Sequence, residues 1–339
     1  MALIEFTDRG LYCPLADVYI DPWRPVARAL ITHGHADHAR PGHGSYLCTG
    51  AAAPILKHRL GAIDVQTLGY GETLHMGGVD ISFHPAGHVI GSAQIRLARG
   101  GEVWVISGDY KTENDGLSEP FEPVRCTHFV SECTFGLPVF KWQPQAQVAQ
   151  DLNAWWAQNA AHGVTSILGA YSLGKAQRLL TMLDPDVGPI LTHGAVAATN
   201  TVLRNQGVDL PDTVQVTAEL DRKAYPGALV IAPPAALDSA WAKRFGTRST
   251  AFASGWMRMR GVRRRRAADR GFIMSDHADW PGLLQAIAET GAENIYVTHG
   301  YTDIFARYLQ DQGYNAEIIP TEFGTGEDAD SPAQADQPA

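Results

Sequence analysis

One short segment constrains the fold of this chain more than any other part of it. The sequence LITHGHADHARPGHG at residues 30–44 follows an apolar run and places four ligand-type side chains within six positions: His33, His35, Asp37 and His38. Because side chains alternate in direction along such a loop, His33 and His35 can face one metal ion while Asp37 and His38 face a neighbouring ion. Imidazole and carboxylate together suit Zn²⁺, Mn²⁺ or iron. The segment therefore predicts a dinuclear metal site after a strand, with a solvated histidine-rich loop as the alternative.

Further ligand-type side chains stand at the ends of short strand-like runs before residue 135. The runs ARALITH, VDISFHPAGH, EVWVISGD and THFVSECT carry His33, His88, Asp109 and Glu132 at or near their ends. Each run pairs a β-rich sequence with a polar terminus, which predicts strands separated by glycine- and proline-rich turns. Because α/β enzymes commonly assemble sites at strand ends, these side chains are expected to meet. His43 lies past the metal-type pattern and is expected at the surface.

From about residue 137 the pattern changes to helices alternating with buried strands. QAQVAQDLNAWWAQNAA predicts a helix, VTSILGAYSLGKAQRLLTMLD predicts a strand, a turn and a helix, and GPILTHGAV and GALVIAPP predict further strands. This alternation is typical of a parallel sheet. Further on, Asp279 is suited to cap a helix that ends at Gly291, and a strand then leads to His299. The tail from residue 324 has no core-forming pattern and is expected to be disordered.

Charge is distributed unevenly along the chain. The net charge is −9, but seven acidic and no basic residues follow Arg307: Asp311, Glu317, Glu322, Glu327, Asp328, Asp330 and Asp336. The rest of the chain holds 27 basic and 29 acidic residues, and seven arginines lie within residues 258–270. The acidic total therefore does not exclude nucleic acid as a partner.

The sequence also bears on the compartment. It has no run of about 18 apolar residues, so no membrane span is expected. Its N-terminus carries Glu5 and Asp8 where a signal peptide would carry Lys or Arg. The four cysteines form no C-x-x-C pair, which fits a reducing environment. We expect a cytoplasmic protein.

The metal-type motifs resemble those of the metallo-β-lactamase superfamily. H-x-H-x-D-H after a strand is followed by GH at His88 and SGD at Asp109, and YIDP at Asp21 matches an early structural aspartate of that family. The resemblance implies an α/β fold, the αββα sandwich, with two divalent ions, either zinc or manganese, with iron as a further option. It assigns one ion to three histidines and the other to an aspartate and two histidines: His33, His35 and His88; Asp37, His38 and His299. Asp109 would bridge both ions together with a hydroxide, and Asp21 would support the metal loop from behind.

Three further motifs resemble those of the β-CASP nucleases. They are SECTFG with Glu132, SDHADW with His277 and THG with His299, and a module of about 120 residues lies between the first two. The resemblance implies an α/β β-CASP cap inserted into the lactamase-like domain. The expected division is a first lactamase-like part at 1–136, a cap at 137–262, a return segment at 263–323 and an acidic tail at 324–339.

The same resemblance assigns chemistry to individual residues. It places four residues in the catalytic machinery: Asp37, Asp109, Glu132 and His277. Glu132 would orient His277 and make its imidazole more basic, and His277 would then protonate or stabilise the leaving oxygen. The structural alternatives are a strand-end salt bridge for Glu132 and a position merely before a helix for His277.

Two segments have features of nucleic-acid contacts. In AYSLGKAQR, Ser172, Gly174 and Lys175 lie where a strand turns into a helix, whose free N–H groups suit a phosphate. The alternative is a well-capped helix start with a solvated lysine. Arginine forks match phosphate oxygens, so backbone contacts are expected from some of Arg258, Arg260, Arg263 and Arg264. A solvated connector is the alternative for this run.

Two long segments, residues 10–42 and 253–284, resemble compact bacterial exonucleases that are associated with DNA ligase and related to Artemis-type enzymes. This resemblance implies a DNA exonuclease in DNA repair that starts from a 5′ end, favours DNA over RNA, and has a DNA ligase or helicase as partner. The DNA-repair relatives often vary at the position of His299, which this chain retains, so an RNA-processing endonuclease stays open. A small-molecule thioester or lactam hydrolase and a non-catalytic scaffold stay open as well.

Overall fold

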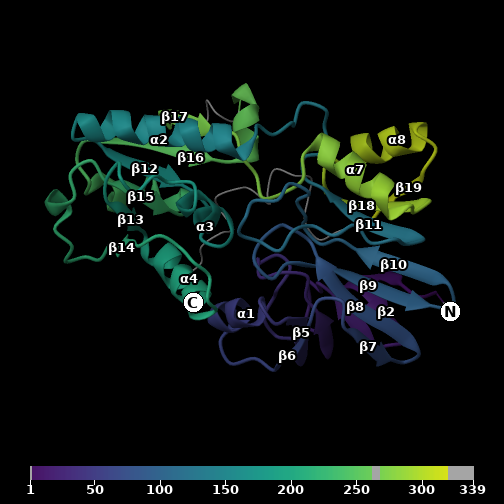
Figure 1. The fold of residues 1–339 in the computed structure, drawn as a ribbon. Helices are drawn as coiled ribbons and strands as arrows, with labels where there is room; N and C mark the ends of the chain where they lie inside the picture. Colours follow the sequence, from purple (N-terminus) through teal and green to yellow (C-terminus); the bar gives the residue numbers. More distant parts are fainter. Residues whose placement is uncertain (1, 262–267, 320–339) are drawn as a thin grey trace. The chain divides into compact units, whose positions relative to one another are not determined.

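The computed structural model describes residues 2–261 and 268–319, which form two compact units of mixed α/β structure (Figure 1). The first unit contains residues 2–141 and 276–319, and the second contains the described residues between 142 and 275. The expected tail at 324–339 lies outside the described residues. None of the helices in the described part of the chain is both long and apolar enough to cross a membrane.

The first unit begins with a six-stranded sheet. Its strands follow one another in chain order: β1 (Glu5–Thr7), β2 (Gly10–Cys13), β3 (Val18–Ile20), β4 (Arg28–Leu30), β5 (Ser45–Thr49) and β6 (Val65–Leu68). The pairing is antiparallel as far as β3 and parallel from β3 to β6. Helix α1 (Ala53–Leu60) packs on this sheet through Leu56, which shares an apolar cluster with Ile31, Tyr46 and Cys48.

A seven-stranded sheet completes the first unit. Its spatial order is β19 (Asn315–Ile318), β18 (Asn294–Gly300), β11 (His128–Cys133), β10 (Glu102–Ile106), β9 (Ala93–Arg99), β8 (Val79–Pro85) and β7 (Thr73–Met76). Helices α7 (Trp280–Thr290) and α8 (Thr302–Asp311) pack on one face through Leu283 and Phe305. As predicted, Asp279 caps α7 by accepting a hydrogen bond from Gly282 N at 3.0 Å, and Gly291 ends the helix with a left-handed backbone.

The two sheets of the first unit share one apolar core. Ile20 and Leu30 from the first sheet lie in the same cluster as Phe83, Ile95 and Ile106 from the second. With helices on the outer faces, the layers run helix, sheet, sheet, helix, as expected for an αββα sandwich. Burial between the sheets fixes the register of the strands, and with it the positions of the loops at their ends.

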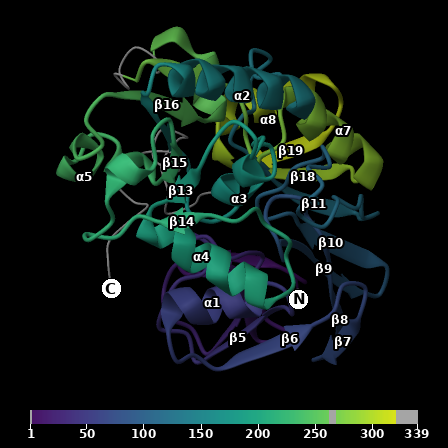
Figure 2. The same ribbon diagram turned by 60° about the vertical axis from the view of Figure 1, so that its left-hand side comes forward.

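The second unit is built on a sheet whose strand pairs are all parallel. Its order is β14 (Val214–Gln215), β13 (Ile190–Thr192), β15 (Leu229–Ala232), β12 (Thr165–Gly169), β16 (Arg248–Ala253) and β17 (Arg270–Phe272). Its helices are α2 (Gln145–Ala161), α3 (Lys175–Leu180), α4 (Gly194–Asn205) and α5 (Ala240–Lys243), with short 3₁₀ turns at Arg222–Ala224, Pro234–Ala236 and Gly255–Arg258 (Figure 2). The helix, strand and parallel-sheet predictions for this region are confirmed.

Both boundaries of the second unit lie later than the sequence suggests, at 142 and 275 where 137 and 262 were expected. The sequence analysis puts the return segment at 263–323, yet β17 pairs with β16 through Phe272 and Ala253. Phe272 also packs in the core of the second unit beside Leu168. Residues 268–275 therefore belong with the second unit because they extend its sheet.

Candidate metal centre

Three histidines and one aspartate of the first unit converge. His33 follows β4, His35 lies two residues on, and His88 and Asp109 follow β8 and β10. His35 Nδ1 lies 3.1 Å from His33 Nε2 and 3.0 Å from His88 Nε2. Asp109 Oδ2 lies 3.4 Å from His33 Nε2 and 3.7 Å from His88 Nε2. Four ligand atoms within 4.8 Å of one another form a group that can hold a metal ion.

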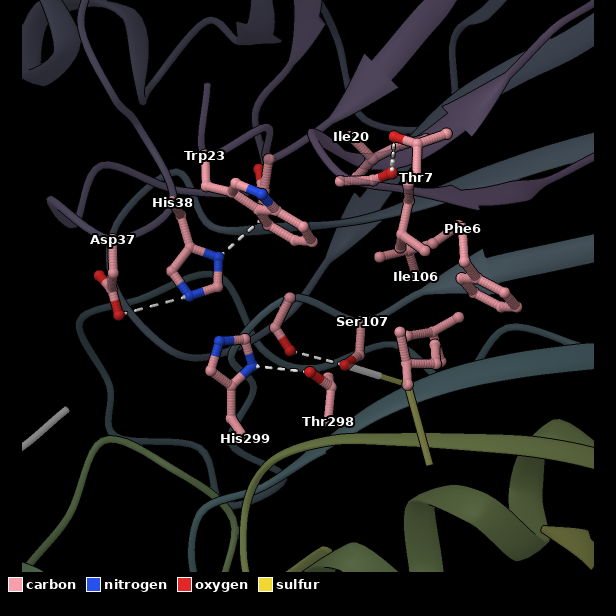
Figure 3. A pocket seen from close by; sticks show the side chains of 16 residues that line it. Phe6, Thr7, Ile20, Trp23, Asp37, His38, Ile106, Ser107, Thr298 and His299 are labelled. Carbon is pink, nitrogen blue, oxygen red and sulfur yellow. Dashed lines mark hydrogen bonds and ion pairs between the residues drawn. The ribbon is translucent and has the colours of Figure 1, made fainter. Parts of the chain in front are cut away.

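The other oxygen of Asp109 faces a second group. His38 Nε2 lies 3.4 Å from Asp109 Oδ1 and 3.8 Å from Asp37 Oδ2. The ring of His299, at the end of β18, has its centroid 5.7 Å from that of His38. Figure 3 shows Asp37, His38 and His299 side by side at one end of a pocket. Asp109 thus stands between two His/Asp clusters, an arrangement typical of a dinuclear metal site of the metallo-β-lactamase type.

Two glycines allow the loops to approach closely. Gly87 precedes His88 and has a φ of +76°, and a Cβ there would lie 2.2 Å from the carbonyl oxygen of Lys111. Gly108 precedes Asp109 with a φ of +55°, and a Cβ there would lie 2.6 Å from Thr32. Since a side chain would collide at both positions, only glycine lets these loops pack against each other.

Hydrogen bonds behind the clusters fix the orientation of two histidines. Asp21 accepts hydrogen bonds from Thr32 N at 2.8 Å, from Thr32 Oγ1 at 2.5 Å and from His38 Nδ1 at 2.7 Å. His88 Nδ1 donates to the carbonyl oxygen of Asp276 at 2.7 Å. In both rings Nδ1 is engaged, so Nε2 is the nitrogen that faces Asp109 and could bind a metal ion.

The electrostatics of the clusters fit a cation. Burial lowers the pKa of His33 and His88 well below the usual range, which keeps these imidazoles neutral as metal ligands must be. Burial alone would raise the pKa of Asp109, but His38 and His277 hold it well below its usual range. For His38 burial is outweighed by Asp109 and Asp37, which raise its pKa. The neutral imidazoles of His33 and His88 with the ionised carboxylate of Asp109 are a donor set for a divalent ion.

Glu132 and His277 form a pair beside Asp109. Glu132, near the end of β11, is only 1% exposed. Its Oε1 accepts a hydrogen bond from His277 Nδ1 at 2.9 Å, and its Oε2 accepts one from Thr134 N at 2.9 Å. Ligand-type atoms of Glu132, His277 and Asp109 lie within 4.8 Å of one another. The structure therefore brings together two residues that are 145 positions apart.

The pocket beside Asp37, His38 and His299 extends between the two sheets. Most of its wall is uncharged, and the labelled apolar side chains in Figure 3 are Phe6, Ile20, Trp23 and Ile106. The ionisable residues of its lining are Asp21, Asp37, His38 and His299. Charge within the pocket is thus concentrated at the candidate metal ligands.

The residues expected to hold a phosphate are engaged with one another in the second unit. Lys175 is 2% exposed, and its ammonium lies 4.7 Å from the centroid of the Tyr171 ring, so the alternative of a solvated lysine is wrong. Gly174 N donates to Gln177 Oε1 at 2.8 Å, and Gln177 Nε2 donates to the carbonyl oxygen of Ser172 at 2.9 Å. These contacts occupy groups that a phosphate would need, and phosphate binding at this turn stays a prediction.

The other expected nucleic-acid contacts are four arginines, and two of them lie in the described part of the chain. Arg258 and Arg260 are exposed, whereas Arg263 and Arg264 lie outside the described residues.

The expectation of a surface position for His43 is wrong. Its ring is buried, Nδ1 accepts a hydrogen bond from Val26 N at 3.3 Å, and the ring packs 5.1 Å from Tyr46.

Sequence reasoning missed one residue that contacts the metal loop. Arg59 of α1 donates hydrogen bonds to two carbonyl oxygens of the segment that carries His33 to His38. A single arginine in a helix has no distinctive spacing, so nothing in its sequence neighbourhood distinguishes it from a surface cation.

Comparisons with known proteins bear on the class of protein. No family model matches the chain. A probable DNA ligase of Opitutus terrae is 31% identical over 313 residues, which cover 91% of this chain and 30% of the ligase. The endoribonuclease YSH1 of Candida albicans is 29% identical over 122 residues, covering 35% of this chain and 14% of that protein. A ribonuclease of Thermus thermophilus is 26% identical over 202 residues, covering 51% of this chain and 44% of that protein.

A solved structure has a similar fold. A protein of unknown function from Enterococcus faecalis matches with a TM-score of 0.58 at 10% identity, over 88% of this chain and 80% of that one. Taken with the His/Asp clusters, these relatives define the class as metallo-β-lactamase-type metalloproteins. More narrowly, the chain is a homologue of the metallo-β-lactamase/β-CASP nucleases, which confirms the family resemblance. It spans less than half the length of each of the three sequence relatives.

Metal removal is expected to lower the stability of the protein. An ion that binds the folded chain and not the unfolded chain stabilises by about 2.7 kcal/mol at a concentration 100 times its dissociation constant. We expect Zn²⁺ or Mn²⁺ to raise the melting temperature of metal-depleted protein by several degrees, and a chelator to reverse this. Differential scanning calorimetry measures both changes. A melting temperature that neither ion alters would contradict a metal centre.

Proposed function

We propose that this chain is a metal-dependent exonuclease that hydrolyses phosphodiester bonds of DNA from a 5′ end. The observation that carries the proposal is the placement of Asp109 between two His/Asp clusters, with the Glu132–His277 pair beside it. A nuclease needs cationic groups for a phosphate and a proton source for a leaving oxygen, and this arrangement offers both.

Different residues of the chain would bind the metal ions and orient the metal ligands. Two groups would each hold one divalent ion on either side of Asp109: His33, His35 and His88; Asp37, His38 and His299. Bound there, such ions, zinc or manganese in this proposal, would lower the pKa of a water and neutralise charge on the phosphate. The buried carbonyl of Asp276 and the carboxylate of Asp21 keep His88 and His38 in the orientation that this requires.

His277 is the proposed proton donor. Its Nδ1–H is held by Glu132, so the proton transferred to the leaving oxygen would come from Nε2. The departing alkoxide oxygen takes that proton as the phosphorus–oxygen bond breaks, and His277 becomes neutral. Glu132 stabilises the charged form beforehand, because a buried carboxylate favours an imidazolium hydrogen-bonded to it.

The preference for DNA rests on the extent of the similarity. The match to the probable DNA ligase covers 91% of this chain, whereas the match to the endoribonuclease of Candida albicans covers 35%. The ligase is also much longer than the matched region, so a homologue of this chain forms part of a polypeptide named as a ligase. We therefore propose a role in DNA repair with a DNA ligase as partner, and the second unit as a β-CASP cap.

An RNA-processing endonuclease is the second candidate. The retained His299, whose ring lies beside that of His38, favours two complete ligand groups, and two of the relatives are named as ribonucleases. A small-molecule hydrolase shares the metal chemistry but would turn over a thioester and leave nucleic acids intact. A scaffold would have no need of two complete groups of ligand-type side chains.

Product mapping separates these candidates. Single-stranded DNA and RNA of one sequence, labelled at either end, are incubated with the protein and Mn²⁺ or Zn²⁺. A 5′ exonuclease releases the 5′ label as a short product at the earliest times, while the 3′ label passes through a series of shortening strands. Internal cuts confined to RNA would overturn the proposal in favour of the endonuclease.

A further inference from the structure

Arg59 lies in the last turn of α1, directly behind the loop that carries four of the candidate ligands. We propose that Arg59 is a positioning residue that fixes this loop in the geometry needed to bind metal. The inference rests on the proposed metal centre, but it concerns a residue that contacts no candidate ligand side chain through a hydrogen bond in the described structure.

The contacts of Arg59 span the whole ligand segment. Its Nη1 donates to the carbonyl oxygen of Gly34 at 2.6 Å and lies 3.4 Å from that of Ala39. Gly34 stands between His33 and His35, and Ala39 follows His38 directly. One guanidinium therefore joins the beginning and the end of the H-x-H-x-D-H segment.

Backbone burial explains why the loop needs this donor. Gly34 and Ala39 are buried, and a buried carbonyl oxygen left without a donor destabilises the fold. The guanidinium offers charge-assisted hydrogen bonds from a rigid, planar fork, which a lysine ammonium on a flexible stem does not reproduce. The loop makes one further closing bond, from Ala39 N to His35 O at 2.9 Å.

The guanidinium is itself held by a rigid element. Ile55 and Leu56 anchor α1 in the core of the first unit, so the base of the arginine side chain is fixed. Burial lowers the pKa of Arg59, and the carboxylate of Asp37 offsets part of this effect, which places its positive charge near that candidate ligand. Arg59 therefore links the packed helix to the loop and stands near a negative charge of the site.

The test measures metal affinity without substrate. The full chain is depleted of metal and titrated with Zn²⁺ against a chromophoric chelator at about 25 °C. Replacing Arg59 with methionine is expected to weaken binding about 10- to 100-fold, the range found when groups that orient metal ligands are removed. Arg59→Lys should recover part of the loss. Lys57→Met is the matched control, since it removes an exposed cation from the same helical turn and should leave the affinity unchanged.

The melting temperature of the metal-free variants separates positioning from general stabilisation. A merely structural role would lower that temperature in Arg59→Met and leave the zinc dissociation constant at its wild-type value, which overturns the inference. If Arg59→Met does not fold, Arg59→Gln, which keeps a neutral donor, decides the question by the same criterion. Wild-type protein that binds zinc but cuts no nucleic acid would instead overturn the proposed function and leave this inference standing.

Discussion

Replacing Asp109 with alanine is expected to lower nuclease activity on the order of 10³-fold or more. Its two carboxylate oxygens face different His/Asp clusters, so its loss removes a ligand atom from both. Stabilisation of transition-state charge by metal ions contributes several kcal/mol, and each step of about 1.4 kcal/mol is a factor of ten in rate. Initial rates on 5′-labelled DNA measure the effect, and atomic absorption of the purified variant should show fewer than two ions per chain.

The control for this prediction is another aspartate paired with a histidine. Asp80 lies 2.6 Å from His75 Nδ1 in the second sheet, and both of these side chains are exposed. Asp80→Ala should keep full activity and full metal content. Near-UV circular dichroism verifies that Asp109→Ala is folded. A folded Asp109→Ala variant with wild-type activity would refute the assignment of the metal centre.

Replacing His277 with glutamine is expected to lower kcat on DNA by about 10²- to 10⁴-fold, the usual contribution of a general acid. The loss should depend on the leaving group, because nitrophenolate departs without protonation and an alkoxide does not. Activity on a bis(nitrophenyl) phosphate should therefore fall much less than activity on DNA. Two ions per chain should remain bound.

Two further variants test the role of His277 as the proton donor. His75→Gln removes an exposed histidine of the same unit and should leave both substrates unaffected. Glu132→Gln should lower the rate on DNA less than His277→Gln does, because the amide oxygen can still accept the hydrogen bond from His277 Nδ1, although the bond from Thr134 N is then lost. Equal losses on DNA and on the nitrophenyl ester in His277→Gln would show that His277 does not donate the proton.

Much of the local structure followed from sequence because it depends on short-range geometry. The helix Gln145–Ala161 and the cap and end of α7 arise from periodicity and from residues that suit helix termini. A glycine at position 87 permits the close approach of two loops, because any Cβ there would strike the Lys111 carbonyl. Parallel strands in the second unit follow from the alternation of helices and strands.

Predictions of exposure failed where polar side chains found partners inside the protein. His43 was expected at the surface, but Val26 N–H supplies a donor and Tyr46 supplies a packing surface. A solvated cation at a helix start was one interpretation of Lys175, yet its ammonium lies over Tyr171. Residue type sets the cost of burying a polar group, and only tertiary contacts decide whether that cost is offset.

The residues that can form the centre are evident from the chain alone, because ligand chemistry and tight spacing are properties of a short segment. Six consecutive positions contain four ligand-type residues: His33, His35, Asp37 and His38. The groups that hold these side chains in place become evident only in the folded chain. The carboxylate of Asp21 and the guanidinium of Arg59 reach the loop through the packing of β3 and α1, and such contacts between distant segments depend on the register of sheets and helices.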